Sequence, residues 1–351
     1  MPDAPSLADL GGWPAVLGRL TRRQDLSGDE AGAALAEILE GDATPAQIAG
    51  FCIALRMKGE TVDEMAGMLA TMLRFATRVP LPEDLPVVDT CGTGGDRSHT
   101  INVSTLAALV VAGAGVPVCK HGNRAASSAC GSADVLEALG VAIDLGPQEV
   151  ADCVAQAGMG FCFAPKFHGA MRHAGPTRRE LGVPTVLNFL GPLANPARVK
   201  RQTLGVSDPS MAERMIGVLA ANGCARALVV YGHDGLDELS TTTTSTVLDL
   251  QDGAVRTYVV DPAHVGLPHA SAGSLRGGDA TTNADLARRV LDGENGPHRD
   301  IVVLNAAAGI VAGGRADSLG AGVEAATASI DEGRAAGVLD AMVRVSNGKA
   351  L

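Results

Sequence analysis

The spacing of hydrophobic positions changes near residue 79 of the 351-residue chain. Before that point, hydrophobic residues recur every three or four positions, which is the period of amphipathic helices. Three of these segments open with a capping box, a hydroxyl residue followed three positions later by Glu or Gln: Ser27–Glu30, Thr44–Gln47 and Thr61–Glu64. Gly41 and Gly59 stand where two of the helices should end. We expect residues 1–78 to form a small helical domain.

A proline-rich stretch, VPLPEDLP at residues 79–86, separates this region from a different pattern. Beyond it, short β-branched runs such as VVDT, VPVCK and RALVVYG alternate with alanine-rich segments of helical period. Alternating strands and helices are typical of an α/β domain built on a mainly parallel sheet. The last ~70 residues return to helical patterns. We therefore predict an α/β fold, with a small N-terminal helical domain (1–78) and a larger α/β domain (79–351).

Composition narrows the range of functions. The net charge of −11 and the aromatic content of 3% argue against a general nucleic-acid-binding protein, which needs a basic face or stacking aromatics. The seven cysteines form no CxxC pair, so we expect reduced thiols and no zinc site. No uncharged apolar run approaches the length of a membrane span, and the first residues lack a secretory pattern. We expect a cytoplasmic protein that binds neither nucleic acid nor membrane.

The segment VVDTCGTGGDRSHTINVST begins like a buried strand and continues as a loop containing Gly92, Gly94 and Gly95. A helix is expected to begin near Ser104. The free N–H groups and partial positive charge of a helix N-terminus favour an anion, and glycines allow a ligand close to the backbone. The spacing matches neither the dinucleotide fingerprint nor the Walker A loop. An ordinary strand-to-helix turn remains the alternative.

A second segment, KHGNRAASSACGSADVLEALG, also follows a predicted strand. Lys120 and Arg124 could bind phosphate, and Ser127, Ser128 and Ser132 could donate hydroxyl hydrogen bonds. Because α/β sheets bind ligands at the carboxyl ends of their strands, this segment should converge with the glycine loop. Two unrelated surface turns would give the same pattern.

Two adjacent carboxylates, Asp237 and Glu238, follow the predicted strand RALVVYG. Oxygen ligands at a strand end suit a magnesium ion that is shared with substrate phosphates. Taken alone, the pair is better explained by the preference for acidic residues at a helix start.

Considered together, nine segments point to one family: AQIAGFCIALRMKGET, CGTGGD, NVST, KHGNRAASS, GSADVLEALGV, FAPKFHGAMRH, RRELGVPTVLNFLGPLANPA, DGLDELSTTTTST and LRGGDATTNA. In this order they closely resemble the anthranilate phosphoribosyltransferases, over nearly the whole chain. The resemblance implies the fold of class II nucleoside phosphorylases, with helices from about 169–182 added to the helical domain, and a homodimer joined through that domain. The implied reaction joins anthranilate to 5-phosphoribosyl-1-pyrophosphate with Mg²⁺. Its products are N-(5-phosphoribosyl)anthranilate and pyrophosphate, at the second step of tryptophan synthesis.

The resemblance also implies site residues. Contacts to phosphoribosyl pyrophosphate would come from Gly92, Gly95, Asp96, Thr100, Asn102, Val103, Ser104, Thr105, Lys120, His121, Gly122, Asn123, Arg124, Ala125, Ala126, Ser127, Ser128 and Ser132. Magnesium ligands would be Ser104, Asp237 and Glu238. Anthranilate would contact Gly92, Asn123 and Arg178, with His121 and His173 nearby. No residue is assigned as a catalytic acid or base, because an attacking aniline nitrogen becomes acidic and can lose its proton late.

The sequence departs from the family pattern at Arg97, where glycine is usual, and at Gly169 and Ala194. Arg97 could add a phosphate contact, narrow the loop or point to solvent. Three other functions stay open: a pyrimidine nucleoside phosphorylase of the same fold, a non-catalytic nucleic-acid-binding relative, and a transferase for another aromatic amine.

Overall fold

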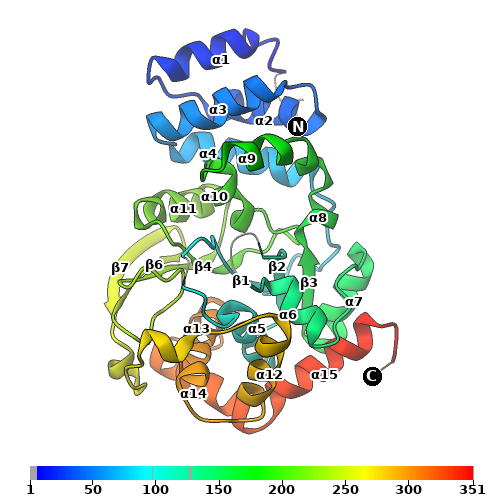
Figure 1. Cartoon of the computed structure of the whole chain (residues 1–351), viewed down its shortest axis with the longest axis vertical. Helices are drawn as coiled ribbons and strands as arrows, with labels where there is room; N and C mark the ends of the chain where they lie inside the picture. The colour runs from blue at the N-terminus through cyan, green and yellow to red at the C-terminus, as the bar shows by residue number, and fades with distance from the viewer. Residues whose placement is uncertain (1–5, 97, 126–128, 351) are drawn as a thin grey trace.

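The computed structural model describes residues 6–96, 98–125 and 129–350, which form a helical region and an α/β region (Figure 1). The helical region contains α1 (Gly12–Thr21), α2 (Gly28–Glu40), α3 (Pro45–Lys58) and α4 (Val62–Phe75). All three predicted capping boxes are present, at the starts of α2, α3 and α4. The short helices η1 (Gly169–His173) and α9 (Gly175–Leu181) pack against α2 and α3 although they come from the middle of the chain.

The α/β region is built on one seven-stranded sheet in the order β3-β2-β1-β4-β5-β6-β7. Neighbouring strands from β3 to β5 pair in parallel. β6 pairs antiparallel with both β5 and β7. The predicted fold class, a mainly parallel α/β domain with a helical domain, is confirmed. The strands are β1 (Val88–Gly92), β2 (Val118–Gly122), β3 (Met159–Phe163), β4 (Arg201–Gly205), β5 (Arg226–Gly232), β6 (Ser245–Gln251) and β7 (Ala254–Val260).

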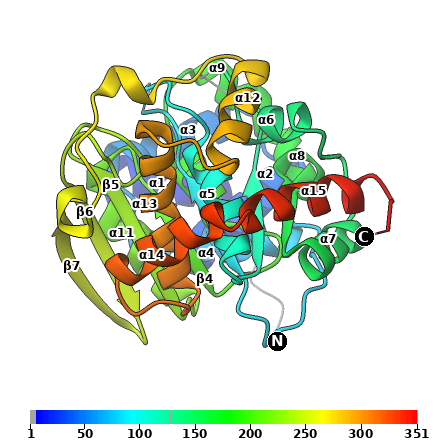
Figure 2. The same cartoon turned by 90° about the horizontal axis from the view of Figure 1, so that it is seen from below.

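Helices cover both faces of the sheet. Figure 2 shows α5, α13, α14 and α15 on one face, where their apolar side chains form a large buried cluster. On the other face, α10 and α11 pack against α4, so the helical region and the sheet share a second core. The remaining helices are α5 (Val103–Gly113), α6 (Ser132–Ala138), α7 (Pro147–Ala157), α8 (Ala164–Phe167), α10 (Val186–Leu193), α11 (Pro209–Ala221), η2 (Pro262–Val265), η3 (Ala272–Leu275), α12 (Ala280–Leu291), α13 (Pro297–Ala312), α14 (Leu319–Asp331) and α15 (Arg334–Ser346). No helix in the described part of the chain is long and apolar enough to cross a membrane.

Two strands, β4 and β7, are absent from the sequence-based prediction. β4 lies at the centre of the sheet between β1 and β5, yet its residues Gln202 and Thr203 are polar and almost fully buried. The Gln202 amide donates to the Pro192 carbonyl at 2.7 Å and to the Cys91 sulfur at 3.1 Å. Hydrophobic pattern alone misses such a strand, because its polar groups find their partners only in the folded protein.

Candidate active site

A cleft of about 490 Å³ lies at the carboxyl ends of β1 and β2, facing the helical region. This is the edge at which parallel α/β sheets bind ligands. A larger hollow, of about 970 Å³, lies beside α2 and α4, but none of the predicted site residues lines it. The cleft brings together most of the predicted contacts: Gly92, Gly95, Asp96, Thr100, Asn102, Val103, Ser104, Lys120, His121, Gly122, Asn123, Arg124, Ala125, Ser132, Asp237 and Glu238.

The glycine loop, which we define as Gly92–Asp96, leaves β1 at the centre of the cleft. Gly94 and Gly95 have φ angles of 66° and 85°, a backbone conformation that favours glycine. The Gly94 N–H donates to Asp237 Oδ2 at 2.7 Å. At Gly92, which has ordinary φ, the reason for glycine is space, because a Cβ there would lie 2.3 Å from the same carboxylate oxygen. The loop therefore lets the backbone and Asp237 approach one another closely.

The N-terminus of α5 forms the next wall, and the helix begins at Val103 as the sequence suggested. The Ser104 N–H donates to Glu238 Oε1 at 3.2 Å. Behind it, Lys120 is 1% exposed, and its Nζ donates to the Thr90 carbonyl and, at 3.2 Å, to Ser104 Oγ. A buried cation next to a helix N-terminus makes this end of the cleft favourable for an anion. Thr105 is fully buried and does not line the cleft.

Carboxylates gather opposite Lys120. Burial, together with the nearby negative charge of Asp96, raises the pKa of Asp237 to about 7. Burial and the charge of Asp237 raise the pKa of Glu238 well above its usual range, although Lys120 opposes that rise. Each carboxylate thus destabilises the ionised form of its neighbour, and a divalent cation would relieve that repulsion.

The oxygen atoms available in the cleft suit magnesium better than a metal ion whose ligands all come from the protein. No group of three or more His, Cys, Asp or Glu residues in the described chain forms a ready metal site. Magnesium typically takes one or two carboxylates and completes its shell with water and substrate phosphates. Asp237, Glu238 and the Ser104 hydroxyl are oxygen ligands of that kind at the cleft wall.

Arg124, in the loop after β2, already forms ion pairs with residues of the protein. The Arg124 guanidinium donates to Asp134 Oδ1 at 2.8 Å and to Glu137 Oε2 at 2.9 Å, so its charge is shared with two carboxylates. The predicted contacts Ala126, Ser127 and Ser128 lie outside the described residues, as does Arg97.

His121, which lines the cleft, is a poor proton acceptor. Burial, with contributions from His168 and Lys120, lowers the pKa of His121 to about 3. The rings of His121 and His168 lie 5.5 Å apart between centroids. Burial also lowers the pKa of His168. A neutral His121 with this pKa would be a weak general base at neutral pH.

Arg178 is not among the residues that line the cleft. It belongs to α9, where burial lowers its pKa and Cys52 of α3 opposes that shift. His173 packs against Gly41 of the helical region. The assignment of Arg178 to anthranilate therefore remains a prediction.

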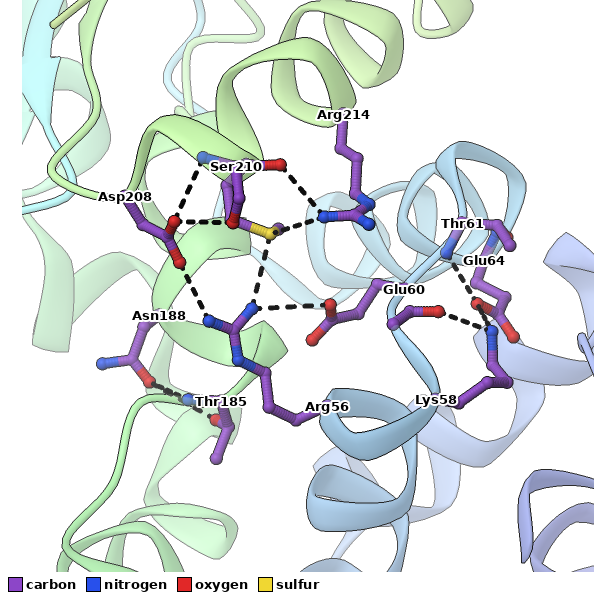
Figure 3. Close-up of polar contacts among 12 residues, drawn as sticks. Arg56, Lys58, Glu60, Thr61, Glu64, Thr185, Asn188, Asp208, Ser210 and Arg214 are labelled. Atoms are coloured by element: carbon purple, nitrogen blue, oxygen red, sulfur yellow. Dashed lines mark hydrogen bonds and ion pairs between the residues drawn. The ribbon is translucent and has the colours of Figure 1, made fainter. Parts of the chain in front are cut away.

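The structure adds cleft residues that sequence analysis did not select. Arg56 comes from α3 and Phe189 from α10, while Ser207 and Asp208 precede α11. Figure 3 shows Arg56 and Asp208 pointing toward one another between the two regions of the chain. One signal was available, because Arg56 lies inside the segment AQIAGFCIALRMKGET that carries part of the family resemblance.

Comparison with known proteins gives a consistent result. Residues 14–76 match the helical bundle domain of a glycosyl transferase family, and residues 84–336 match its a/b domain. The chain is 55% identical to the anthranilate phosphoribosyltransferase of Rhodococcus jostii over 344 residues, covering 96% of this chain and 94% of the relative. For the Chloroflexus aggregans enzyme the values are 53% over 337 residues, with 95% and 98% coverage.

Solved structures agree with these relatives. Anthranilate phosphoribosyltransferase from Thermus thermophilus superposes with a TM-score of 0.90 at 41% identity, covering 95% of this chain and 99% of the other. The Saccharomyces cerevisiae protein, solved in complex with PRPP and Mg, gives a TM-score of 0.87 at 29% identity, with coverage of 96% and 98%.

Proposed function

The chain belongs to the anthranilate phosphoribosyltransferase family, and on this premise we propose how its cleft carries out the reaction. The enzyme transfers the phosphoribosyl group of 5-phosphoribosyl-1-pyrophosphate to the amine of anthranilate. The products are N-(5-phosphoribosyl)anthranilate and pyrophosphate. This reaction is the second step of tryptophan synthesis from chorismate. One observation carries the proposal: the glycine loop, the α5 N-terminus, Lys120 and the Asp237–Glu238 pair all line one cleft.

Breaking the bond between the anomeric carbon and pyrophosphate leaves negative charge on the leaving group and positive charge on the ribosyl centre. Lys120, Ser104 and the α5 N-terminus face that leaving group in our proposal, and they stabilise its charge without having to reorganise. Asp237, Glu238 and Ser104 would hold Mg²⁺, which supplies Lewis-acid stabilisation of the phosphate oxygens when bound.

The acceptor is positioned rather than activated. We propose that anthranilate contacts Gly92 and Asn123, and that Arg178 binds its carboxylate with two parallel hydrogen bonds. Holding the amine in line with the anomeric carbon lowers the entropic part of the barrier. No acid or base is assigned, and the low pKa of His121 supports leaving it out of that role.

The assay follows the loss of anthranilate fluorescence with purified protein, phosphoribosyl pyrophosphate and Mg²⁺, and then with a chelator. We expect consumption that stops when the metal is removed. Parallel reactions with another aromatic amine, or with phosphate and a pyrimidine nucleoside, test the two neighbouring enzyme functions. Turnover in either of those reactions without anthranilate consumption would overturn the proposal.

Arg178 is tested by replacement with alanine. Loss of a charge-assisted hydrogen bond costs about 1.5–3 kcal/mol, so the KM for anthranilate should rise roughly 10–100-fold. The KM for phosphoribosyl pyrophosphate should change little. Anthranilate kinetics close to those of the wild type would remove Arg178 from the site.

We also propose that the protein is a cytoplasmic homodimer joined through its helical region, as the family resemblance suggests. Sedimentation analysis of the full chain tests the dimer. A monomer at micromolar concentration would contradict it.

A further inference from the structure

Arg56 occupies the point where the helical region meets the cleft. It lies near the C-terminus of α3, and its side chain is 33% exposed. Its Nη2 donates to Asp208 Oδ2 at 2.9 Å (Figure 3). Its guanidinium also lies 5.3 Å from the centre of the Phe189 ring. Among the described residues, this is the one ion pair that joins helices α1–α4 to the α/β region.

A buried carboxylate holds Arg56 in place from the other side. Glu60 is 2% exposed, and neither of its side-chain oxygens has a hydrogen-bond partner among the described residues. Its Oε2 lies 3.7 Å from Arg56 Nη1. Because a buried carboxylate is costly without a nearby cation, Glu60 favours keeping the guanidinium where it is. Arg56 is therefore not a freely rotating surface arginine.

Asp208 is connected to the glycine loop through its neighbour in the chain, Ser207. Ser207 donates from Oγ to the Gly94 carbonyl at 2.7 Å and from its N–H to Thr93 Oγ1 at 3.0 Å. The Gly94 N–H in turn binds Asp237. A shift of Asp208 would therefore reach the loop and the predicted magnesium ligand through directly bonded neighbours.

We propose that Arg56 is a positioning residue for the transferase reaction: through Asp208 and Ser207 it fixes the glycine loop in the conformation that binds the pyrophosphate group. This inference rests on the proposed function. It assigns a role to the segment ALRMKGE (residues 54–60) at the end of α3. None of the substrate contacts proposed above comes from this segment.

The principal test is Asp208→Asn. Asparagine still caps α11 and leaves Arg56 beside Glu60, but the ion pair is lost. We expect the KM for phosphoribosyl pyrophosphate to rise about threefold to tenfold, while the KM for anthranilate stays within a factor of two. Arg214→Met is the matched control, because in the described part of the chain the hydrogen bonds of the Arg214 side chain go to Ser210 and Met211 of its own helix; its KM values should equal those of the wild type.

A double-mutant cycle tests whether the pair acts as a unit. Since Arg56→Met would leave Glu60 without its cation, the cycle is measured in a Glu60→Gln background. Arg56→Met and Asp208→Asn should raise the KM by similar factors, and the double variant should be no worse than the larger single effect. Effects that multiply would overturn the proposal, and so would a KM for phosphoribosyl pyrophosphate that does not change in Asp208→Asn.

Hydrogen exchange gives a readout that does not depend on catalysis. The amides of Thr93 and Gly94 are both hydrogen-bonded in the structure, so their exchange reports opening of the loop. They should exchange faster in Asp208→Asn and at the wild-type rate in Arg214→Met. If the wild-type protein lacks transferase activity, the proposed function fails, and the exchange comparison alone decides the positioning role. Unchanged exchange in Asp208→Asn overturns it.

Discussion

Two buried carboxylates, Glu64 in the helical region and Asp237 in the cleft, have opposite surroundings. In the helical region, Glu64 is fully buried and accepts hydrogen bonds from the Leu26 and Thr61 N–H groups and from Lys58 Nζ, at 2.8, 2.8 and 2.9 Å. In the cleft, Asp237 is 8% exposed, binds the Gly94 N–H and faces another carboxylate, Asp96. Lys58 balances the charge of Glu64, whereas Asp237 lies beside a second negative charge, which supports its proposed role as a magnesium ligand.

The contrast between Glu64 and Asp237 distinguishes a carboxylate that stabilises the fold from carboxylates that are proposed to serve the reaction. A buried ion pair that is fully hydrogen-bonded holds elements together. Glu64 connects Leu26, which precedes α2, with Lys58 at the end of α3 and Thr61 at the start of α4. Carboxylates placed against each other raise their own pKa values and cost stability, a price that proteins accept at functional sites. Mutations of Asp237 and Glu238 should therefore affect activity without loss of stability, and mutation of Glu64 should affect stability without loss of activity.

The largest effect is expected for Asp237→Asn/Glu238→Gln. Removing both carboxylates of the predicted magnesium site should lower kcat/KM by about 10²–10³-fold and abolish its dependence on Mg²⁺. The thermal midpoint should equal or exceed that of the wild type, because repulsion between the carboxylates is relieved. Fluorescence assays and thermal melts check both parts. A variant that keeps magnesium-dependent turnover would place the metal elsewhere.

Gly92→Ala probes the close approach of the loop to Asp237. The added Cβ would lie 2.3 Å from the carboxylate oxygen, so the side chain must move. Displacement of a site group by about 1 Å can cost up to about 10²-fold in rate, and kinetics at varied Mg²⁺ measures it. Gly94→Ala is the control, since its Cβ meets nothing within 4 Å and only strains the backbone. Equal losses in both variants would mean that strain, not the contact with Asp237, is responsible.

Glu64→Gln tests the helical side of the comparison. Breaking a buried ion pair destabilises proteins by about 3–5 kcal/mol. The cost should be near the lower value because Lys58 keeps Asp25 as a partner at 2.7 Å. Urea unfolding measures the loss, while KM and kcat of the folded protein should stay within twofold of the wild type. A large change in KM would show that Glu64 also affects the cleft.

The smallest effect concerns pH. The pKa of His121 falls from 6.5 to about 3 on folding, so below pH 6.5 the unfolded chain binds a proton that the folded chain does not. Its contribution to stability is complete above pH 6.5 and declines on acidification by about 1.4 kcal/mol per pH unit. In His121→Gln, the free energy of unfolding should fall less steeply between pH 6.5 and 5. Identical slopes for the two proteins would show that His121 titrates normally.

The sequence predicted the local features well and the distant contacts poorly. The capping boxes of α2, α3 and α4 depend on residues three positions apart, so a linear pattern reveals them. β4 was missed because Gln202 looks like a surface residue until its partners are known. Arg56 and Asp208 were missed because 152 positions separate them along the chain.

By itself, the sequence determined the class of fold, the glycine loop and the start of α5. These follow from hydrophobic period, capping and glycine content, which act over a few neighbouring residues. Lys120 was a candidate phosphate ligand because of its charge and its place after a predicted strand, whereas the family resemblance selected Asp237 and Glu238 as predicted magnesium ligands. Only the tertiary structure decided that Lys120 is buried beside Ser104, that Thr105 lies behind the cleft wall and that Arg56 reaches Asp208. Burial and electrostatic coupling depend on which distant segments pack together, and no local pattern contains that information.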